Sequence, residues 1–256
     1  MSAELKLRGT SMRAEGVTAG YGGDPVIHAI SVRAEPGEVV SIVGPNGSGK
    51  STLLKSLAGV LRMSAGTVLI GDRDVTNMPP EEIARAGVGY VPQTDDVFAP
   101  LTVRENLEMG GYLLPRREVS AHLEQVLSVF PKLGPMTGRP AGKLSGGERK
   151  MLAMGRVLMI EPAVFLLDEP TANLAPTIAR SLLEEHVRDL ARRGAAVLIV
   201  EQRAKAVLAI SDRTYVLGGG QLRLEGTPAE LSASPEFVDS FLGGGAAGRP
   251  FPPAEG

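Results

Sequence analysis

Cysteine is absent from the sequence, which excludes disulfide bonds, thiolate metal sites and cysteine nucleophiles. No run of apolar residues approaches the roughly 20 that a membrane-spanning helix needs. The N-terminus, MSAELKLRGTSMRAEG, lacks the hydrophobic core of a signal peptide. We therefore expect a cytosolic protein, and docking on a membrane protein is compatible with these absences.

Strong charge of either sign is also lacking. The formal net charge is −2, so the chain has no overall basic field that would favour nonspecific binding to nucleic acid. Hydrophobic residues make up 43% of the 256 residues, which is ordinary for a folded protein with a buried core. This length allows one large domain or two small ones.

Short apolar runs bounded by turn residues predict buried strands at 39–43, 88–91, 163–167 and 196–200. Helical patterns separate these runs. One of them, PTIARSLLEEHVRDLARRG, follows the third strand. Alternating strands and helices indicate a parallel sheet with helices packed on it.

The rest of the chain predicts smaller elements around that sheet. Residues 67–76 and 214–226 have the pattern of antiparallel pairs beside it. Residues 102–160 are almost free of strand patterns and predict a mainly helical insert. We expect residues 1–11 to be a loose leader and the Gly-, Ala- and Pro-rich residues 243–256 to be a mobile tail.

The stretch GPNGSGKST fits the phosphate-loop pattern G-x-x-x-x-G-K-[ST] between a predicted strand and a predicted helix. Bare glycine backbone lets N–H groups surround phosphate oxygens, and the helix N-terminus adds partial positive charge. Lys50 would neutralise the β- and γ-phosphates, and the Ser51 hydroxyl would coordinate Mg²⁺. The alternative is a glycine-rich turn without a ligand, which the strand and helix context disfavours. The nucleotide-binding candidates here are Gly44, Pro45, Asn46, Gly47, Ser48, Gly49, Lys50, Ser51 and Thr52.

Two carboxylates, Asp168 and Glu169, end the apolar run VFLLDEP. Ligands of parallel sheets lie at the carboxyl ends of the strands, and carboxylates are costly inside a core. Asp168 would hold Mg²⁺, and Glu169 would act as the general base that polarises the attacking water. The alternative is that the pair caps the following helix.

A third glycine-rich stretch, KLSGGERKMLAMGRVLM, begins with Ser145, Gly146 and Gly147 and continues into an amphipathic helix. Bare backbone at a helix start is a second anion site. On its own, such a stretch is more often an ordinary helix start. A single nucleotide does not obviously need two such sites about a hundred residues apart in the chain.

Together these motifs resemble those of the ATP-binding cassette family. GPNGSGKST, LSGGE (144–148) and LLDEP (166–170) match its phosphate loop, signature and acidic motif in the right order. The resemblance covers about residues 12–242. It implies an α/β fold: a P-loop NTPase core with a mainly parallel sheet, an antiparallel β subdomain and a helical subdomain at about 94–160. It also implies ATP hydrolysis with Mg²⁺, coupled to transmembrane transport.

The resemblance assigns roles to further residues. Tyr21 matches the aromatic that stacks on adenine, and the alternative is a buried core tyrosine. Gln93, after the strand at 88–91, matches the glutamine that reaches Mg²⁺ and the attacking water, and the alternative is an exposed loop residue. The implied Mg²⁺ ligands are thus Ser51, Gln93 and Asp168.

The family also implies partners. In a head-to-tail dimer, the signature residues Ser145, Gly146, Gly147 and Glu148 of one copy face the ATP held by the other, which resolves the question of two anion sites. The second ATPase subunit is either an identical copy or a related chain. Membrane permeases bind the dimer at the cytoplasmic face of the inner membrane, and a periplasmic binding protein acts indirectly. Phe98 and Leu101 lie in the stretch that matches the permease-binding surface.

The sequence departs from the family pattern at two positions. The family usually has histidine after the strand at 196–200, where this chain has Gln202. Glutamine can hydrogen-bond a phosphate but cannot carry a proton, so hydrolysis would depend more on Glu169. The family usually has aspartate in the loop after the acidic pair, where this chain has Ala175. Contacts across the dimer would then use backbone or neighbours such as Asn173.

These departures, with GVTAGYGG and VFAPLTVRENLEMG, resemble the ATPase subunits of branched-chain amino-acid importers. The cargo is inferred by similarity alone, because the transported solute does not touch this subunit. Import of urea or short amides is an alternative, as is export of lipid or polysaccharide. A cassette ATPase acting on nucleic acid or ribosomes is disfavoured, since the chain lacks long coiled coils, a second cassette and a basic charge.

Overall fold

The computed structural model describes residues 5–94 and 96–237. Its main sheet has the order β10-β9-β3-β8-β7-β6, in which β10 alone is antiparallel to its neighbour. The strands are β3 (Val39–Val43), β6 (Val88–Val91), β7 (Val164–Asp168), β8 (Ala196–Glu201), β9 (Arg213–Gly218) and β10 (Gln221–Gly226). The sequence placed 214–226 beside the parallel sheet, but β9 pairs with β3 and joins it.

The central strands are apolar throughout because both faces of the sheet are covered. In β7, Phe165 and Leu167 pack into one hydrophobic core, and Val164 and Leu166 pack into the other. This alternation explains why the strands read as continuous apolar runs rather than as alternating patterns. The helices of the insert and those after β7 cover the first face.

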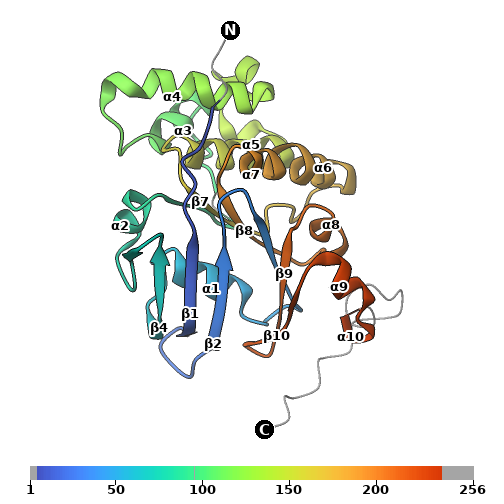
Figure 1. Ribbon diagram of the computed structural model, residues 1–256. Coiled ribbons are helices and arrows are strands. Elements are labelled where there is room, and N and C mark those ends of the chain that lie inside the picture. Colours follow the sequence, from blue (N-terminus) through green and yellow to red (C-terminus); the bar gives the residue numbers. More distant parts are fainter. Residues whose placement is uncertain (1–4, 95, 238–256) are drawn as a thin grey trace.

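A second, antiparallel sheet covers the other face together with helix α1 (Lys50–Leu57). Its order is β2-β1-β4-β5. The strands are β1 (Met12–Ala19), β2 (Ile27–Ala34), β4 (Met63–Ile70) and β5 (Arg73–Asp74). Helix α1 contacts β1 on one side and β7 and β8 on the other, so it lies between the two sheets (Figure 1).

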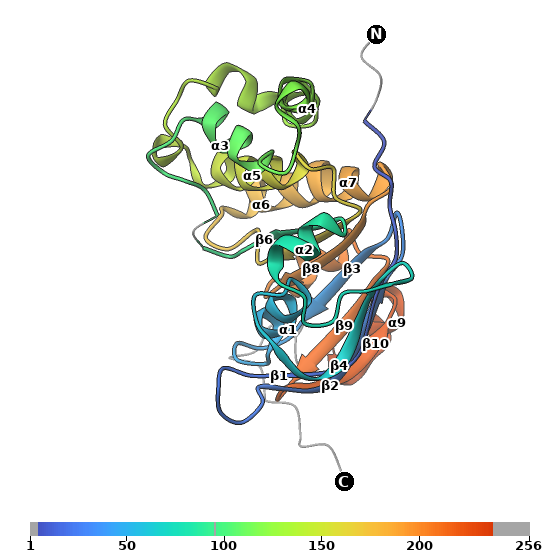
Figure 2. The same ribbon diagram turned by 90° about the vertical axis from the view of Figure 1, so that its left-hand side faces the viewer.

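The predicted helical insert forms one end of the molecule (Figure 2). It contains α3 (Val103–Gly110), α4 (Arg116–Val129), short 3₁₀ turns at Pro131–Met136 and Ala141–Lys143, and α5 (Gly146–Leu158). Thr102 begins α3 and Ser145 begins α5, each in a capping box that satisfies backbone donors at the helix start. We call α3 to α5 the helical subdomain.

The remaining helices lie mostly after β7. Residues 176–194 are predicted as one helix, and the observed helical run extends from Pro176 to Arg192. It has a π-helical stretch at Leu182–Val187 between α6 (Pro176–Ser181) and α7 (Arg188–Arg192). The others are α2 (Pro80–Arg85), α8 (Ala204–Leu208), α9 (Pro228–Ala233) and α10 (Pro235–Phe237). Within residues 5–94 and 96–237, no helix is long and apolar enough to cross a bilayer.

The prediction of a loose leader is wrong for residues 5–11. Leu5 and Leu7 are buried in the core, and the Leu7 N–H donates to the Arg193 carbonyl at 2.8 Å. The Arg193 guanidinium donates in turn to the Leu5 carbonyl. Leu5 and Leu7, at alternate positions, pack this segment beside α7. Two leucines are too short an apolar pattern to predict a buried element from the sequence. Residues 1–4 and the predicted tail at 243–256 lie outside the described residues.

Candidate nucleotide site

Four strand ends bring the predicted site residues together. The strands β3, β8, β7 and β6 are parallel neighbours, so their carboxyl ends share one edge of the sheet. The phosphate loop follows β3, Asp168 ends β7 with Glu169 after it, Gln202 follows β8, and Gln93 comes two residues after β6. The fold therefore assembles at one edge residues that are up to about 160 positions apart in the chain.

The phosphate loop needs glycine for steric reasons. Gly49 has φ 96°, and a Cβ there would lie 2.3 Å from the Cγ2 atom of Ile27. A Cβ on Gly44 would lie 2.4 Å from the Leu217 carbonyl oxygen. Gly47 has φ 77° and open space around it. The chain thus closes tightly around Gly44 and Gly49, while Pro45, Asn46 and Gly47 are exposed.

Two polar groups of this loop fit an anionic ligand. The Lys50 ammonium is buried and donates to the carbonyls of Gly44 at 2.9 Å and Pro45 at 3.0 Å. Burial lowers its pKa, and the nearby carboxylates of Glu169 and Asp168 oppose this effect. The Ser48 hydroxyl is buried and, within the described residues, has no hydrogen-bond partner. A phosphate oxygen would satisfy both groups.

Asp168 is held by hydroxyl groups from two neighbouring elements. Ser51 donates to its Oδ1 at 2.9 Å, and the Tyr90 hydroxyl donates to its Oδ2 at 3.4 Å. Burial raises the pKa of Asp168, and the bond from Ser51 opposes this. Thr52, also predicted in this loop, is buried. A Mg²⁺ ion would offset the cost of the buried charge on Asp168.

The oxygen atoms of Ser51 and Asp168 suit Mg²⁺, which binds few protein ligands and completes its shell with water and phosphate oxygens. In residues 5–94 and 96–237, no group of three or more His, Cys, Asp or Glu side chains could hold a metal by itself. The Ser51 and Asp168 oxygens fit a metal that also binds phosphate oxygens of a nucleotide.

Glu169 lies between two glutamines. The Gln93 amide donates to its Oε2 at 2.7 Å, and the Gln202 amide donates to Oε1 at 2.8 Å and to Oε2 at 2.7 Å. Glu169 has φ 46°, a left-handed conformation uncommon for a side chain of this size, and its N–H donates to the Val200 carbonyl. Strain of this kind persists where the surrounding structure imposes it and is common at functional sites.

The sequence reasoning missed two residues that contact or adjoin the acidic pair. Tyr90 reaches Asp168 from β6. Glu201 is buried at the end of β8, where burial raises its pKa while its Oε1 accepts the Thr171 N–H at 2.9 Å. Tyr90 lies three residues before Gln93, and Glu201 directly precedes Gln202. The periodicity of a buried strand does not distinguish a core residue from one that reaches the site.

The signature residues lie elsewhere in the same chain. Ser145, Gly146 and Gly147 begin α5, and the two views both place α5 apart from α1 (Figures 1 and 2). The Glu148 carboxylate accepts the Ser145 N–H at 2.8 Å, and this bond lowers the pKa of Glu148. Glu148 thus has a local role in capping the helix. Its contact with a nucleotide stays a prediction.

Tyr21 is 62% exposed, so the alternative of a buried core tyrosine is wrong. The Lys55 ammonium, on the helix that follows the phosphate loop, lies 5.8 Å from its ring centroid. An open aromatic face beside a cation suits stacking on a base. Its stacking on adenine stays a prediction.

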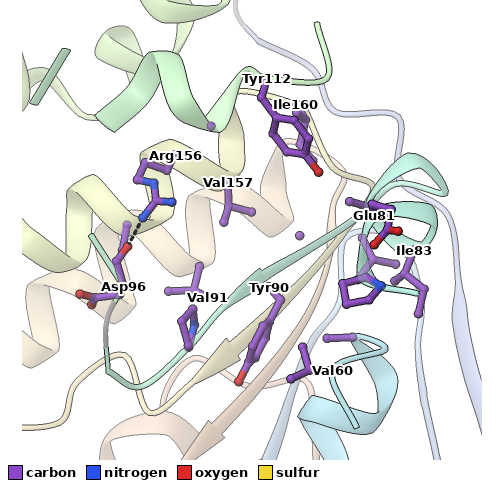
Figure 3. A pocket seen from close by; sticks show the side chains of 18 of the residues that line it. Val60, Glu81, Ile83, Tyr90, Val91, Asp96, Tyr112, Arg156, Val157 and Ile160 are labelled. Carbon is purple, nitrogen blue, oxygen red and sulfur yellow. Dashed lines mark hydrogen bonds between the residues drawn. The ribbon is translucent and has the colours of Figure 1, made fainter. Parts of the chain in front are cut away.

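A cavity of about 400 Å³ lies between α2 and β6 on one side and α3 and α5 on the other (Figure 3). Three exposed apolar side chains line it: Val60, Met109 and Tyr112, with Tyr112 65% exposed. Leu101 is only half-buried and is not part of the lining. Phe98 is exposed as expected and packs under the Arg156 guanidinium, 4.4 Å from its ring centroid.

Comparisons with known proteins agree with this architecture. A family model described as ABC transporter matches residues 27–172. The high-affinity branched-chain amino acid transport ATP-binding protein BraG of Pseudomonas aeruginosa is 39% identical over 228 residues, which cover 89% of this chain and 97% of the relative. The probable branched-chain amino acid transport ATP-binding protein LivF of Archaeoglobus fulgidus is 38% identical over 232 residues, covering 91% and 98%.

Among solved structures, an ATP-binding cassette of an ABC transporter in its ADP conformation superposes with a TM-score of 0.82 at 31% identity, covering 90% of this chain and 97% of that one. The fold and site thus define a nucleotide-binding P-loop ATPase. The chain belongs to the ABC transporter family, as an ATPase subunit coupled to transport. The predicted family and fold class are confirmed.

Proposed function

We propose that this chain hydrolyses ATP to drive import of branched-chain or other hydrophobic amino acids. The observation that carries the hydrolytic role is the position of Glu169, which two glutamine amides hold beside Asp168 and the phosphate loop. The relatives in Pseudomonas aeruginosa and Archaeoglobus fulgidus are named as branched-chain amino acid transport ATP-binding proteins, which supports the cargo. The near-neutral charge argues against action on nucleic acid.

The residues of the site would have separate roles in ATP binding and hydrolysis. Lys50 and the backbone of the phosphate loop would bind the phosphates, and Tyr21 would stack on the base. Ser51, Asp168 and Gln93 would hold Mg²⁺, which when bound neutralises charge on the phosphates. Glu169 would accept a proton from the attacking water, and the amides of Gln93 and Gln202 would orient its carboxylate.

A second ATPase chain would complete the site. Ser145, Gly146, Gly147 and Glu148 form the start of α5 in the helical subdomain, and α5 lies apart from α1, the helix that follows the phosphate loop (Figures 1 and 2). They would therefore serve the nucleotide of an identical or related chain placed head to tail. Gly146 and Gly147 present backbone N–H groups at the start of a 13-residue helix, which favours binding of an anion.

The cavity between α2 and the helical subdomain would receive a short cytoplasmic helix of a permease. Val60, Met109 and Tyr112 offer it an apolar surface, and Glu81 and Arg156 on the same lining offer charged groups. Apolar cavities with a few polar groups are typical binding sites for amphipathic helices. The chain would thus lie at the cytoplasmic face of the inner membrane, with a periplasmic binding protein as an indirect partner.

Replacing the proposed base tests the hydrolytic role. Glu169→Gln should abolish most ATP hydrolysis while Mg²⁺-dependent ATP binding survives, and ATP should then hold two chains together in size-exclusion chromatography. Glu124→Gln, an exposed change on α4, is the matched control. Retained turnover in the Glu169 variant would contradict the assignment.

Uptake of labelled leucine, urea and acetamide by the assembled transporter tests the cargo. Leucine uptake that depends on Glu169 supports the proposal, whereas uptake of urea or acetamide alone would replace it. In the same assay, Tyr112→Glu should lower uptake by weakening assembly with the permease, with ATP binding by the free chain unchanged. Normal assembly of that variant would place the permease on another surface.

A further inference from the structure

We propose that Lys150 is a positioning residue for hydrolysis, which acts through the backbone of Gln93. Lys150 lies on α5, five residues after the signature serine that begins this helix. Its ammonium donates to the Gln93 carbonyl at 2.8 Å. The inference rests on the proposed function, because it takes the assigned role of Gln93 at Glu169 as its starting point.

Lys150 is fixed in place by a buried ion pair. Its Nζ lies 2.7 Å from Oδ2 of Asp96, and the two side chains are 9% and 6% exposed. Within the described residues, this carboxylate oxygen accepts no hydrogen bond of good geometry, so the ammonium provides its compensating charge. Charged side chains are seldom buried to this degree unless they are paired, and pairing at this distance restricts both groups to one arrangement.

Arg156 makes a second set of contacts between α5 and the segment that contains Gln93 and Asp96. Its guanidinium donates to the Asp96 carbonyl at 2.6 Å, the bond drawn in Figure 3, and lies over the ring of Phe98. Lys150 and Arg156 are six residues apart on one helix. Gln93, Asp96 and Phe98 are therefore attached to the helix that begins with the signature, and they follow any movement of that helix.

The contact reaches the catalytic carboxylate in one further step. The backbone of Gln93 is held by Lys150, and its side-chain amide donates to Glu169 at 2.7 Å. Gln93, Lys150 and Asn173 also line one cavity, so α5 meets both the Gln93 loop and the loop after Glu169 there. A displacement of the Gln93 backbone would move its amide relative to Glu169, and small errors of position are costly for catalysis.

The test separates this hydrogen bond from the ion pair. Lys150→Met alone would leave a buried Asp96 charge without compensation, so the comparison is made in an Asp96→Asn background. In that background the polar side chain of asparagine still lies beside the Lys150 ammonium, which keeps its hydrogen bond to the Gln93 carbonyl. Met or Gln then replaces Lys150, since the two side chains are similar in length and only Gln can donate to the Gln93 carbonyl. Lys132→Met removes an exposed lysine charge from the same insert as a control.

Steady-state ATP hydrolysis by the full chain gives kcat and KM. We expect Asp96→Asn and the control to stay within about twofold of wild type, the Met double variant to lose about tenfold in kcat with KM unchanged, and the Gln double variant to recover most of it. Equal kcat for the Met and Gln variants at equal thermal stability would overturn the proposal.

A Gln93→Ala background distinguishes the inference from the function it rests on. If Lys150 acts through the position of Gln93, adding Asp96→Asn and Lys150→Met there should lower kcat by less than about twofold more. A full additional tenfold loss would show a separate structural effect and overturn the inference alone. Unchanged kcat in Gln93→Ala itself would overturn both the assigned role of Gln93 in hydrolysis and the positioning role of Lys150.

Discussion

The side-chain amide nitrogen of Gln202 lies 2.8 Å from Oε1 and 2.7 Å from Oε2 of Glu169. The residue that replaces the usual histidine therefore holds the proposed base directly. Because an amide donates hydrogen bonds but does not titrate, it orients the Glu169 carboxylate without competing for its proton. We therefore propose that Gln202 orients Glu169 in a site that has glutamine in place of the usual histidine.

Removing that amide should lower hydrolysis. We expect Gln202→Ala to lower kcat about tenfold or more, with ATP affinity nearly unchanged, because the carboxylate loses one of its two orienting donors. Gln202→His should recover part of the rate and add a pH dependence between about pH 6 and 7.5, where an imidazole titrates. A pH–rate profile of the three proteins checks both results. Wild-type kcat in Gln202→Ala would contradict the role.

Tyr90 should affect the response to Mg²⁺ rather than the maximal rate. Its hydroxyl donates to Asp168 at 3.4 Å, and burial raises the pKa of this phenol, so it stays protonated at ordinary pH. We expect Tyr90→Phe to raise the Mg²⁺ concentration for half-maximal hydrolysis about threefold, since partners that orient metal ligands tune metal affinity. Tyr215→Phe is the control, and equal Mg²⁺ curves for both variants would refute the effect.

The buried hydroxyl pair Ser41 and Thr214 should give a strongly non-additive result. These residues pair across β3 and β9, and their oxygens lie 2.7 Å apart with no exposure. Ser41→Ala should lower the free energy of unfolding by about 1–3 kcal/mol, because Thr214 then keeps an unsatisfied hydroxyl. Ser41→Ala with Thr214→Val should cost less than the sum of the single changes. Denaturant titration of wild type, both single variants and the double variant measures these free energies. Strictly additive losses would contradict the predicted coupling between the two hydroxyl groups.

Glu201 should make stability depend on pH. Burial raises its pKa above that of the unfolded chain, so its contribution is most favourable below the unfolded value and is lost as pH rises through the folded value. Glu201→Gln keeps an oxygen acceptor for the Thr171 N–H and removes the charge. We expect this variant to gain stability relative to wild type as the pH rises above the pKa of an unfolded glutamate, measured by denaturation at each pH. A difference in stability between Glu201→Gln and wild type that stays constant with pH would contradict the raised pKa of Glu201.

The sequence predicts the core elements because they are marked by local rules. Buried parallel strands read as apolar runs, and the phosphate loop carries glycines whose spacing follows from its geometry. The π-helical stretch at Leu182–Val187 escaped prediction because one short stretch of wider turns shifts the apolar spacing of the whole helical run by only about one residue. The pairing of β9 with β3 escaped it because hairpin signals give a strand's sequence neighbour, not its place in a sheet.

Within the site, motifs identify the residues but not their contacts. Gln93, Glu169 and Gln202 stand out in the sequence, yet their mutual hydrogen bonds depend on which strands are neighbours. The pair Lys150 and Asp96 is less visible still. A lysine on an amphipathic helix and an aspartate in a polar stretch look like surface residues until the packing of the helical subdomain buries them.

The docking of Leu5 and Leu7 beside α7 has a practical consequence for the choice of start codon. Met12 is the first methionine after Met1, and a translation start there would remove both leucines and their two hydrogen bonds with Arg193, one to its backbone carbonyl and one from its guanidinium. The shortened product would open apolar core beside α7 to water. A gene model that begins at Met12 therefore describes a less stable and more aggregation-prone polypeptide.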